Sequence, residues 1–237
     1  MQNLFIIILV SWLAGFAAFV GAVIARIEGS ANTKAKRKLI HGIVAFGGGI
    51  LLAAVAFALV PEGMETLSPL ALGVAFTGGG LLVCLLDARI SRSQSSQAQF
   101  MAMLLDFVPE ALVLGAVFSG SQKEGILLAL FIGAQNLPEG FNAFRESISG
   151  DQAPRTVLMR LLLVSVLGPI SGCLGYLLLQ EHPVVTAWIM SAAAGGILYL
   201  VFQDIAPQSK MRRHWSPTLG AVLGFVLGMI GEQILGG

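Results

Sequence analysis

The chain has 237 residues, of which 56% are hydrophobic and 11% are charged, and its formal net charge is +1. Soluble domains carry about 25% charged residues, so this composition excludes a water-soluble protein and predicts an integral membrane protein. The two cysteines, Cys84 and Cys173, lie in separate apolar runs and provide neither a disulfide framework nor a CxxC pair.

Eight segments approach the ~20 apolar residues that a membrane-spanning helix needs. They lie at 4–25, 40–61, 68–86, 101–120, 124–146, 156–180, 184–203 and 217–235. We therefore predict an all-α integral membrane protein with eight transmembrane helices, formed as a single transporter domain over residues 1–237. The first segment lacks a basic leader and a clean cleavage site, so we expect a helix there rather than a signal peptide.

The basic residues are distributed unevenly between the two sides of the predicted bundle. Of the 14 lysines and arginines, only Lys123 falls outside the loops that follow odd-numbered segments and the borders of those loops. Cytoplasmic loops are rich in basic residues, so both termini are predicted to be extracytoplasmic in a multi-pass protein of the plasma membrane. The basic run at 34–38 either sets this topology alone or also binds anionic lipid.

The fourth and fifth segments carry polar residues inside apolar runs. Asp106 and Glu110 are four residues apart and share one helix face, and Gln135 and Glu139 repeat this arrangement. A proline precedes each glutamate. A carboxylate at mid-membrane costs roughly 2.5–3.5 kcal/mol on insertion, so this repeated pattern calls for a functional explanation.

The topology makes these two segments antiparallel and places their glutamates at similar depth. With Asn136, they would gather three carboxylates and two amides around one point. Such carboxylates coexist only if a cation lies among them or if some are protonated. Pro109 and Pro138 would each free a backbone carbonyl one turn earlier, which favours a divalent-cation site. The alternative is buried, protonated acids beside ordinary proline kinks.

Three further residues are candidates for the pathway to and from this site. Gln203 and Asp204 lie near the cytoplasmic end of the seventh segment, where they form an exit path or a solvated helix end. Glu62 follows Pro61 on the outer side, where it attracts cations at an entrance or lies in a solvated loop.

Three stretches resemble the zinc–iron permease (ZIP, Zrt/Irt-like) family. Residues 135–140, Gln-Asn-Leu-Pro-Glu-Gly, are similar to its fifth-helix signature, residues 47–62 to its second helix and residues 194–204 to its seventh. The resemblance covers nearly the whole chain. It implies uptake of divalent transition metals through a site between helices four and five. It also implies a homodimer, and an elevator-like movement of helices one, four, five and six against the other four.

The chain also departs from the family pattern. Asp106 and Phe107 stand where the fourth-helix motif usually begins with His-Asn, and Gly168-Pro169 replaces the usual Glu-Pro of the sixth helix. The two-metal centre of some members would lose two ligands, so we expect a single site. By position, the residues that match the primary site are Asp106, Glu110, Gln135 and Glu139. Asn136 would be the remnant of the secondary one.

A site without histidine or cysteine is harder than a typical zinc site and should also accept Mn²⁺ or Fe²⁺, with zinc still favoured by the family. Cd²⁺ is a further candidate substrate. We expect metal ions and membrane lipid as partners, no nucleic acid, no prosthetic group and no enzymatic activity. One alternative is a homologue whose site has been repurposed for another cation, for sensing or for a non-transporting role. An intramembrane hydrolase is less favoured, because neither Gly-x-Gly-Asp nor His-Glu-x-x-His is present.

Overall fold

The structure is a computed structural model, and it is helical over almost all of the residues that it describes. The described residues are 2–28, 33–92, 98–120, 122–150, 152–179, 181–212 and 214–235. Their side chains are described except at positions 2, 90–92, 98–99, 101–102, 105–106, 119–120 and 235. The all-α prediction is confirmed for this part of the chain.

The eight predicted segments correspond to eight helical segments, four of which consist of more than one helical element. In chain order the elements are α1 (Gln2–Glu28), α2 (Lys34–Ala54), η1 (Val55–Leu59), α3 (Val60–Thr66), α4 (Pro69–Arg92), α5 (Ala98–Gly120), α6 (Gln122–Ser149), α7 (Pro154–Val164), α8 (Leu167–Leu179), α9 (Pro183–Leu200), η2 (Val201–Ile205), α10 (Ala206–Ser209), η3 (Ser216–Thr218) and α11 (Leu219–Leu235).

Among the described residues, six helical segments are long and apolar enough to cross a membrane. They are Asn3–Glu28, Lys34–Thr66, Pro69–Arg89, Pro154–Leu179, Pro183–Ser209 and Ser216–Ile234. Helix α5 adds a shorter apolar stretch, Phe107–Phe118. Helix α6, which carries the two amides and Glu139, is not among these six segments.

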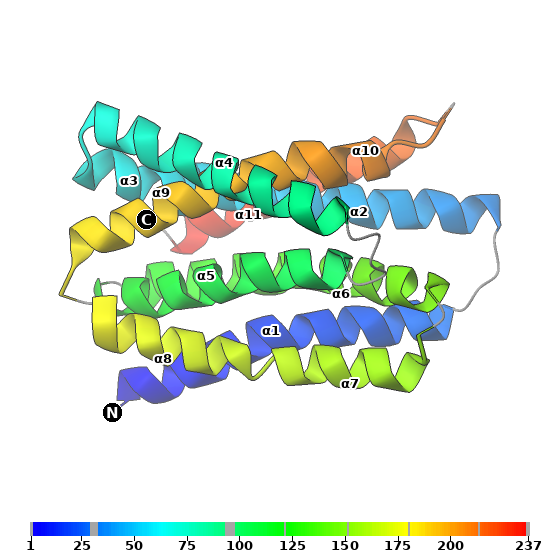
Figure 1. Cartoon of the computed structure of the whole chain (residues 1–237), viewed down its shortest axis with the longest axis horizontal. Helices are drawn as coiled ribbons and strands as arrows, with labels where there is room; N and C mark the ends of the chain where they lie inside the picture. Colours follow the sequence, from blue (N-terminus) through cyan, green and yellow to red (C-terminus); the bar gives the residue numbers. More distant parts are fainter. Residues whose placement is uncertain are drawn as a thin grey trace.

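The helices form two layers (Figure 1). One layer holds α1, α5, α6, α7 and α8, with α1 packed on α6 and α5 packed on α8. The other holds α2, α3, α4, α9, α10 and α11, with α2 packed on α11 and α4 packed on α9. Contacts of α6 with α2 and of α5 with α9 join the layers, so α5 and α6 lie where the layers meet.

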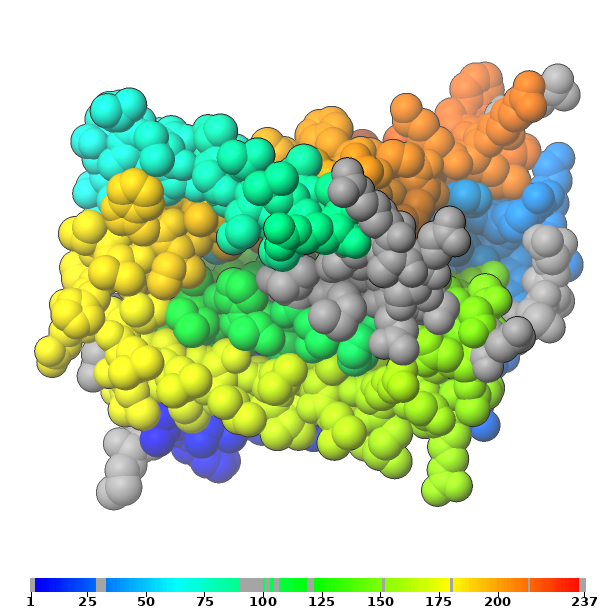
Figure 2. Space-filling view, in the orientation of Figure 1, coloured from blue at the N-terminus to red at the C-terminus, as the bar shows by residue number. Residues whose placement is uncertain are grey.

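Outer helices shield this central pair. In the space-filling view, α4 and α8 form much of the visible face, and only part of α5 shows between them (Figure 2). Helix α1 begins, and α11 ends, toward the same end of the bundle, as an even number of antiparallel segments requires (Figure 1).

Glycines bring the backbones of α1 and α6 into direct contact. A Cβ atom on Gly21 would lie 1.9 Å from the carbonyl oxygen of Leu137, and one on Gly140 would lie 2.0 Å from that of Ala18. No side chain fits either gap, so only glycine permits this approach. The contact holds the proline-containing turn of α6 against α1.

Two helical segments contain a π-helical turn that ends just before a proline. In η1 the cap N–H of Val60 bonds to the carbonyl of Val55, and Pro61 follows. In η2 the cap N–H of Ala206 bonds to the carbonyl of Val201, and Pro207 follows. Such turns are rare and are often found at functional sites. Here each lines a cavity, as described below.

The sixth predicted segment, 156–180, is not one continuous helix. Helix α7 ends at Val164 and α8 begins at Leu167. Pro169 lacks the N–H that would bond to the carbonyl of Ser165, which interrupts the helical ladder at this point. At the same position, the side-chain hydroxyl of Ser165 donates a hydrogen bond to the carbonyl oxygen of Leu162 at 2.6 Å.

Candidate metal site

The structure brings together two of the predicted site residues on α5 and α6. The side-chain amide of Gln135 donates from Nε2 to Oε2 of Glu110 at 2.5 Å. Both side chains are removed from solvent, since Glu110 is 2% exposed and Gln135 is 1% exposed. The antiparallel packing of α5 and α6 therefore places a carboxylate and an amide in contact deep inside the protein.

The same amide leaves an oxygen unsatisfied. Oε1 of Gln135 is buried and has no hydrogen-bond partner within the described part of the chain. Leaving a buried acceptor unpaired costs about 1–3 kcal/mol. A cation bound between this oxygen and the Glu110 carboxylate would satisfy both groups, and these are the oxygen ligands that hard divalent ions prefer.

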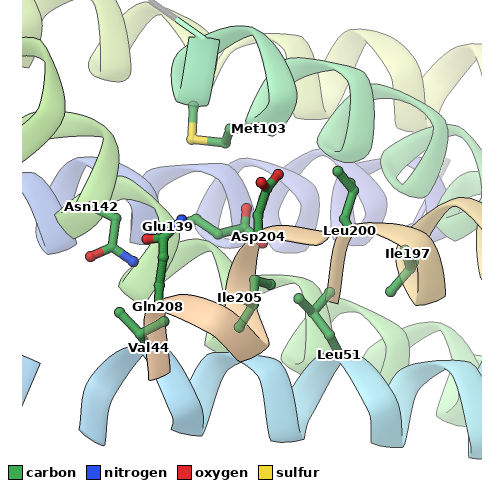
Figure 3. Close-up of a pocket in the computed structure, with 10 residues that line it drawn as sticks. All are labelled: Val44, Leu51, Met103, Glu139, Asn142, Ile197, Leu200, Asp204, Ile205 and Gln208. Carbon is green, nitrogen blue, oxygen red and sulfur yellow. The ribbon is translucent and has the colours of Figure 1, made fainter. Parts of the chain in front are cut away.

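Glu139 lies one helical turn after Gln135, on the same face of α6. It lines a cavity of about 70 Å³ together with Asn142 of α6 and Asp204 of η2 (Figure 3). Gln208 of α10 adds a further polar side chain, and the rest of the lining is apolar. Two carboxylates from opposite layers thus line one cavity.

The prolines are accommodated inside both helices. Pro109 lies within α5 and Pro138 within α6, and each helix continues past its proline. Pro138 packs against α2, where a Cβ atom on Gly47 would lie 2.7 Å from the proline Cγ. Because Pro138 has no N–H, the carbonyl of Ala134 is freed one turn earlier, immediately before Gln135.

Asn136 occupies a different face of α6 from Gln135. Its Nδ2 donates to the carbonyl oxygen of Ala14 at 3.0 Å, and the residue is 1% exposed. This hydrogen bond joins α6 to α1. The structure therefore turns Asn136 toward α1, while its neighbour turns toward Glu110.

The positions that depart from the family pattern pack against one another. Phe107 is 1% exposed, and its ring lies where side chains on α1 and α8 would otherwise extend. A Cβ atom on Gly168 would lie 2.9 Å from Cζ of Phe107, and one on Gly15 would lie 2.6 Å from it. The backbone of α1 also lies close to Gly168, because a Cβ atom on Gly168 would lie only 2.4 Å from the carbonyl oxygen of Ser11. This region is filled by a ring and by backbone.

The remaining predicted residues fall into three situations. Asp106 lies on α5 one turn before Glu110, but its side chain is outside the described residues. Gln203 is exposed, unlike its neighbour Asp204. Glu62 lines a second cavity, of about 220 Å³, at the opposite end of the bundle from Asp204. This second cavity is here called the outer cavity, and the one shared by Glu139 and Asp204 is called the inner cavity.

Several polar residues that line these cavities lie outside the set of predicted site residues. Asn142 follows Glu139 by three residues and so shares its face, a signal that periodicity could have revealed. The outer cavity also contains Glu65, Glu124 and Glu232, which come from α3, α6 and α11. No sequence spacing connects those three glutamates, because only the packing of the helices brings them together.

The fold and the site together define a class of protein. It is a helical membrane protein with carboxylate and amide side chains buried where two helical layers meet. A sequence model of a family described as "ZIP Zinc transporter" matches residues 89–232, which is more than half of the chain. The chain belongs to this ZIP family.

Two curated relatives agree with this assignment. The chain is 31% identical over 141 residues to a protein named Zinc transporter GufA from Myxococcus xanthus, a match that covers 57% of this chain and 54% of that protein. It is 21% identical over 268 positions to one named Zinc transporter ZupT from Chlorobium limicola, which covers 97% of this chain and 96% of that protein. The first match thus spans about half the length of its relative, and the second nearly all of it.

Proposed function

We propose that the protein carries divalent transition-metal ions across the plasma membrane toward the cytoplasm. The observation that carries this proposal is the buried contact of Glu110 with Gln135 on two proline-containing helices, beside an unsatisfied amide oxygen. In this proposal Glu110, Gln135 and Glu139 bind the metal, and Asp106 completes the site from the preceding turn of α5. Asn136 holds α6 against α1.

The donor set suggests which ions are carried. Carboxylate and amide oxygens are hard ligands and accept Zn²⁺, Mn²⁺ and Fe²⁺ without strong discrimination. Zinc is the ion in the printed names of both relatives, which makes it the first candidate here. Competition by Mn²⁺ and Fe²⁺ follows from the ligand set.

We infer that the transport route passes through the two cavities. Metal enters the outer cavity among Glu62 and its neighbouring glutamates, binds at Glu110 and Glu139, and leaves through the inner cavity beside Asp204. The two-layer arrangement is compatible with an elevator-like shift of the layer holding α1, α5, α6, α7 and α8. A homodimer and membrane lipid complete the proposed assembly.

Metal uptake into proteoliposomes tests the proposal directly. Purified wild-type protein should accumulate Zn²⁺, whereas Glu110→Ala and Glu139→Ala should each reduce the initial rate by about 100-fold or more, because a ligand is lost. Glu181→Gln, which removes one exposed carboxylate outside the cavities, should transport like the wild type. Wild-type rates in both alanine variants would refute the assignment.

A second candidate function is a ZIP-like homologue whose site serves another cation or a sensing role. The packing of Phe107 against Gly168, where the family pattern has polar residues, is the observation that favours it. A panel of Zn²⁺, Mn²⁺, Fe²⁺, Co²⁺ and Cd²⁺ separates the two candidates. Saturable uptake of any of these ions supports a divalent-metal carrier, and a flat response to all five supports the repurposed site.

A further inference from the structure

A third cavity, of about 520 Å³, lies at the basic end of the bundle and has no role in the proposed transport. It is lined by basic side chains from two distant parts of the chain, namely Lys34, Arg37, His41, Lys210, Arg212 and His214. Among the described residues that line it, none is acidic. We propose that this basic cavity binds a phosphate group, and specifically the headgroup of an anionic phospholipid.

The first half of the cavity is the amino-terminal end of α2. Lys34, Arg37 and His41 are spaced by three and four residues, so they lie on one face of the helix. The helix begins at Lys34, after Thr33, whose side chain caps the N–H of Lys36 at 3.3 Å. The free N–H groups and the dipole of a helix amino terminus add positive potential on the same side.

The second half is the connection between α10 and η3. A bridge pairs Met211 with His214 and turns the chain back toward α2. His41 fixes the two halves together, because its Nδ1 donates to the carbonyl oxygen of Gln208 at 2.5 Å. The cavity is therefore built by the tertiary fold from segments more than 160 residues apart in the chain.

The electrostatics distinguish this cavity from an ordinary basic surface. Lys36 belongs to the same run but turns away to pair with Glu28, with Nζ and Oε1 3.3 Å apart. His214, in contrast, lies near three like-charged residues. Partial desolvation, together with the positive charges of Lys38, Lys34 and Arg37, lowers the pKa of His214. The positive-inside rule explains why these residues are basic, but not why they converge on one cavity whose described lining contains no carboxylate.

The surroundings favour a lipid headgroup over a free phosphate ion. Trp215, next to His214, is 84% exposed, and Leu39, between the cavity residues of α2, is 59% exposed. Exposed tryptophan at the end of a membrane helix is typical of the interface between bilayer and water. A headgroup phosphate lies at that depth, and anionic lipids attract basic residues there by about 1 kcal/mol for each charge.

Native mass spectrometry of the full chain tests this proposal without using transport as a readout. Protein is extracted from vesicles of phosphatidylcholine with phosphatidylglycerol, and bound lipid is counted. The variant Lys34→Gln/Arg37→Gln/Arg212→Gln should retain severalfold less phosphatidylglycerol than the wild type. The control variant Arg26→Gln/Arg89→Gln/Arg155→Gln loses the same charge from exposed positions outside the cavity and should bind lipid normally. Equal retention by the two variants would overturn the proposal.

Nuclear magnetic resonance of the histidine rings provides a second measurement that does not depend on a variant. The chain has three histidines, so the His214 signal can be assigned by substitution. Phosphatidylglycerol added to the wild-type protein should shift this signal and raise its titration midpoint, since a bound anion favours the imidazolium form. Phosphatidylcholine should not. A shift with inorganic phosphate but not with phosphatidylglycerol would show that the cavity binds free phosphate rather than a lipid headgroup. If neither anion shifts the signal, the cavity is not a phosphate site.

Discussion

At the residue scale, the site depends on the different environments of the two polar atoms of the Gln135 side-chain amide. Gln135 donates its N–H to the buried Glu110 and keeps its oxygen without a partner among the described residues. Asn136, the next residue, directs its amide to the carbonyl of Ala14. Neighbouring amides on one helix thus have different roles, because successive side chains on a helix point about 100° apart.

Phe107 and Gly168 pack closely at two positions that matter for the proposed single metal site. The ring of Phe107 and the carbonyl of Ser11 leave no room for a side chain at Gly168. By the family resemblance, a second metal would need ligands at both of these positions. The residue-scale packing therefore favours one metal per chain.

We expect metal analysis of the purified protein, after Zn²⁺ loading and gel filtration, to find a single tightly bound ion per chain. Glu110→Gln should abolish this binding. Phe107→Asn should not add a second ion, because the carbonyl of Ser11 still closes the space at Gly168. Two tightly bound ions in the wild type, both lost together on acid washing, would contradict the single-site interpretation.

At the element scale, close approach of helix backbones positions α6. Gly21 of α1 lies against the carbonyl of Leu137, and Gly47 of α2 lies against Pro138. The proline-containing turn is therefore held from both sides by glycines. Any larger residue would push α6 away from α1 or α2 and would move Gln135 and Glu139 with it.

Alanine substitution of two glycines tests this packing. Gly21→Ala places a Cβ atom 1.9 Å from a backbone oxygen, so it should destabilise the protein by about 1–3 kcal/mol or more, as overpacking does. Gly73→Ala in α4 meets no atom within 4 Å and should be neutral or stabilising, because alanine favours the helix. Thermal unfolding in detergent compares the two variants. Equal stability would show that the α1–α6 contact is looser than described.

The element boundaries show which local features the sequence reveals. The apolar runs predicted the helical segments well, because length and hydropathy are local properties. The break between α7 and α8 was missed, although Pro169 marks it, because a proline can also be absorbed within a helix, as Pro109 and Pro138 are. The π-helical turns have no strong sequence pattern and were missed as well.

At the scale of the whole molecule, opposite charges collect at opposite ends. The outer cavity holds four glutamates, and the basic cavity at the other end holds lysines, arginines and histidines. An acidic outer cavity raises the local concentration of cations. The basic end is the one that the positive-inside rule assigns to the cytoplasm.

This polarity predicts which side of the membrane can reach each cavity. In a background with Cys84→Ala and Cys173→Ala, a cysteine is placed in the outer cavity by Ala58→Cys or in the inner cavity by Ile205→Cys. A membrane-impermeant thiol reagent applied to intact cells should label the first variant and should label the second only after permeabilisation. The reverse pattern would invert the topology, and therefore the proposed direction of transport.

The sequence alone determined the all-helical membrane fold, the succession of helical segments and the polar residues of α5 and α6, because hydropathy, helical periodicity and proline position are properties of neighbours along the chain. Only the tertiary structure decided which residues meet. It joined Gln135 to Glu110, turned Asn136 toward Ala14 and placed the ring of Phe107 against Gly168. It also assembled the three cavities. Such contacts join residues far apart in the chain, and they arise from the close packing of helices rather than from any local pattern.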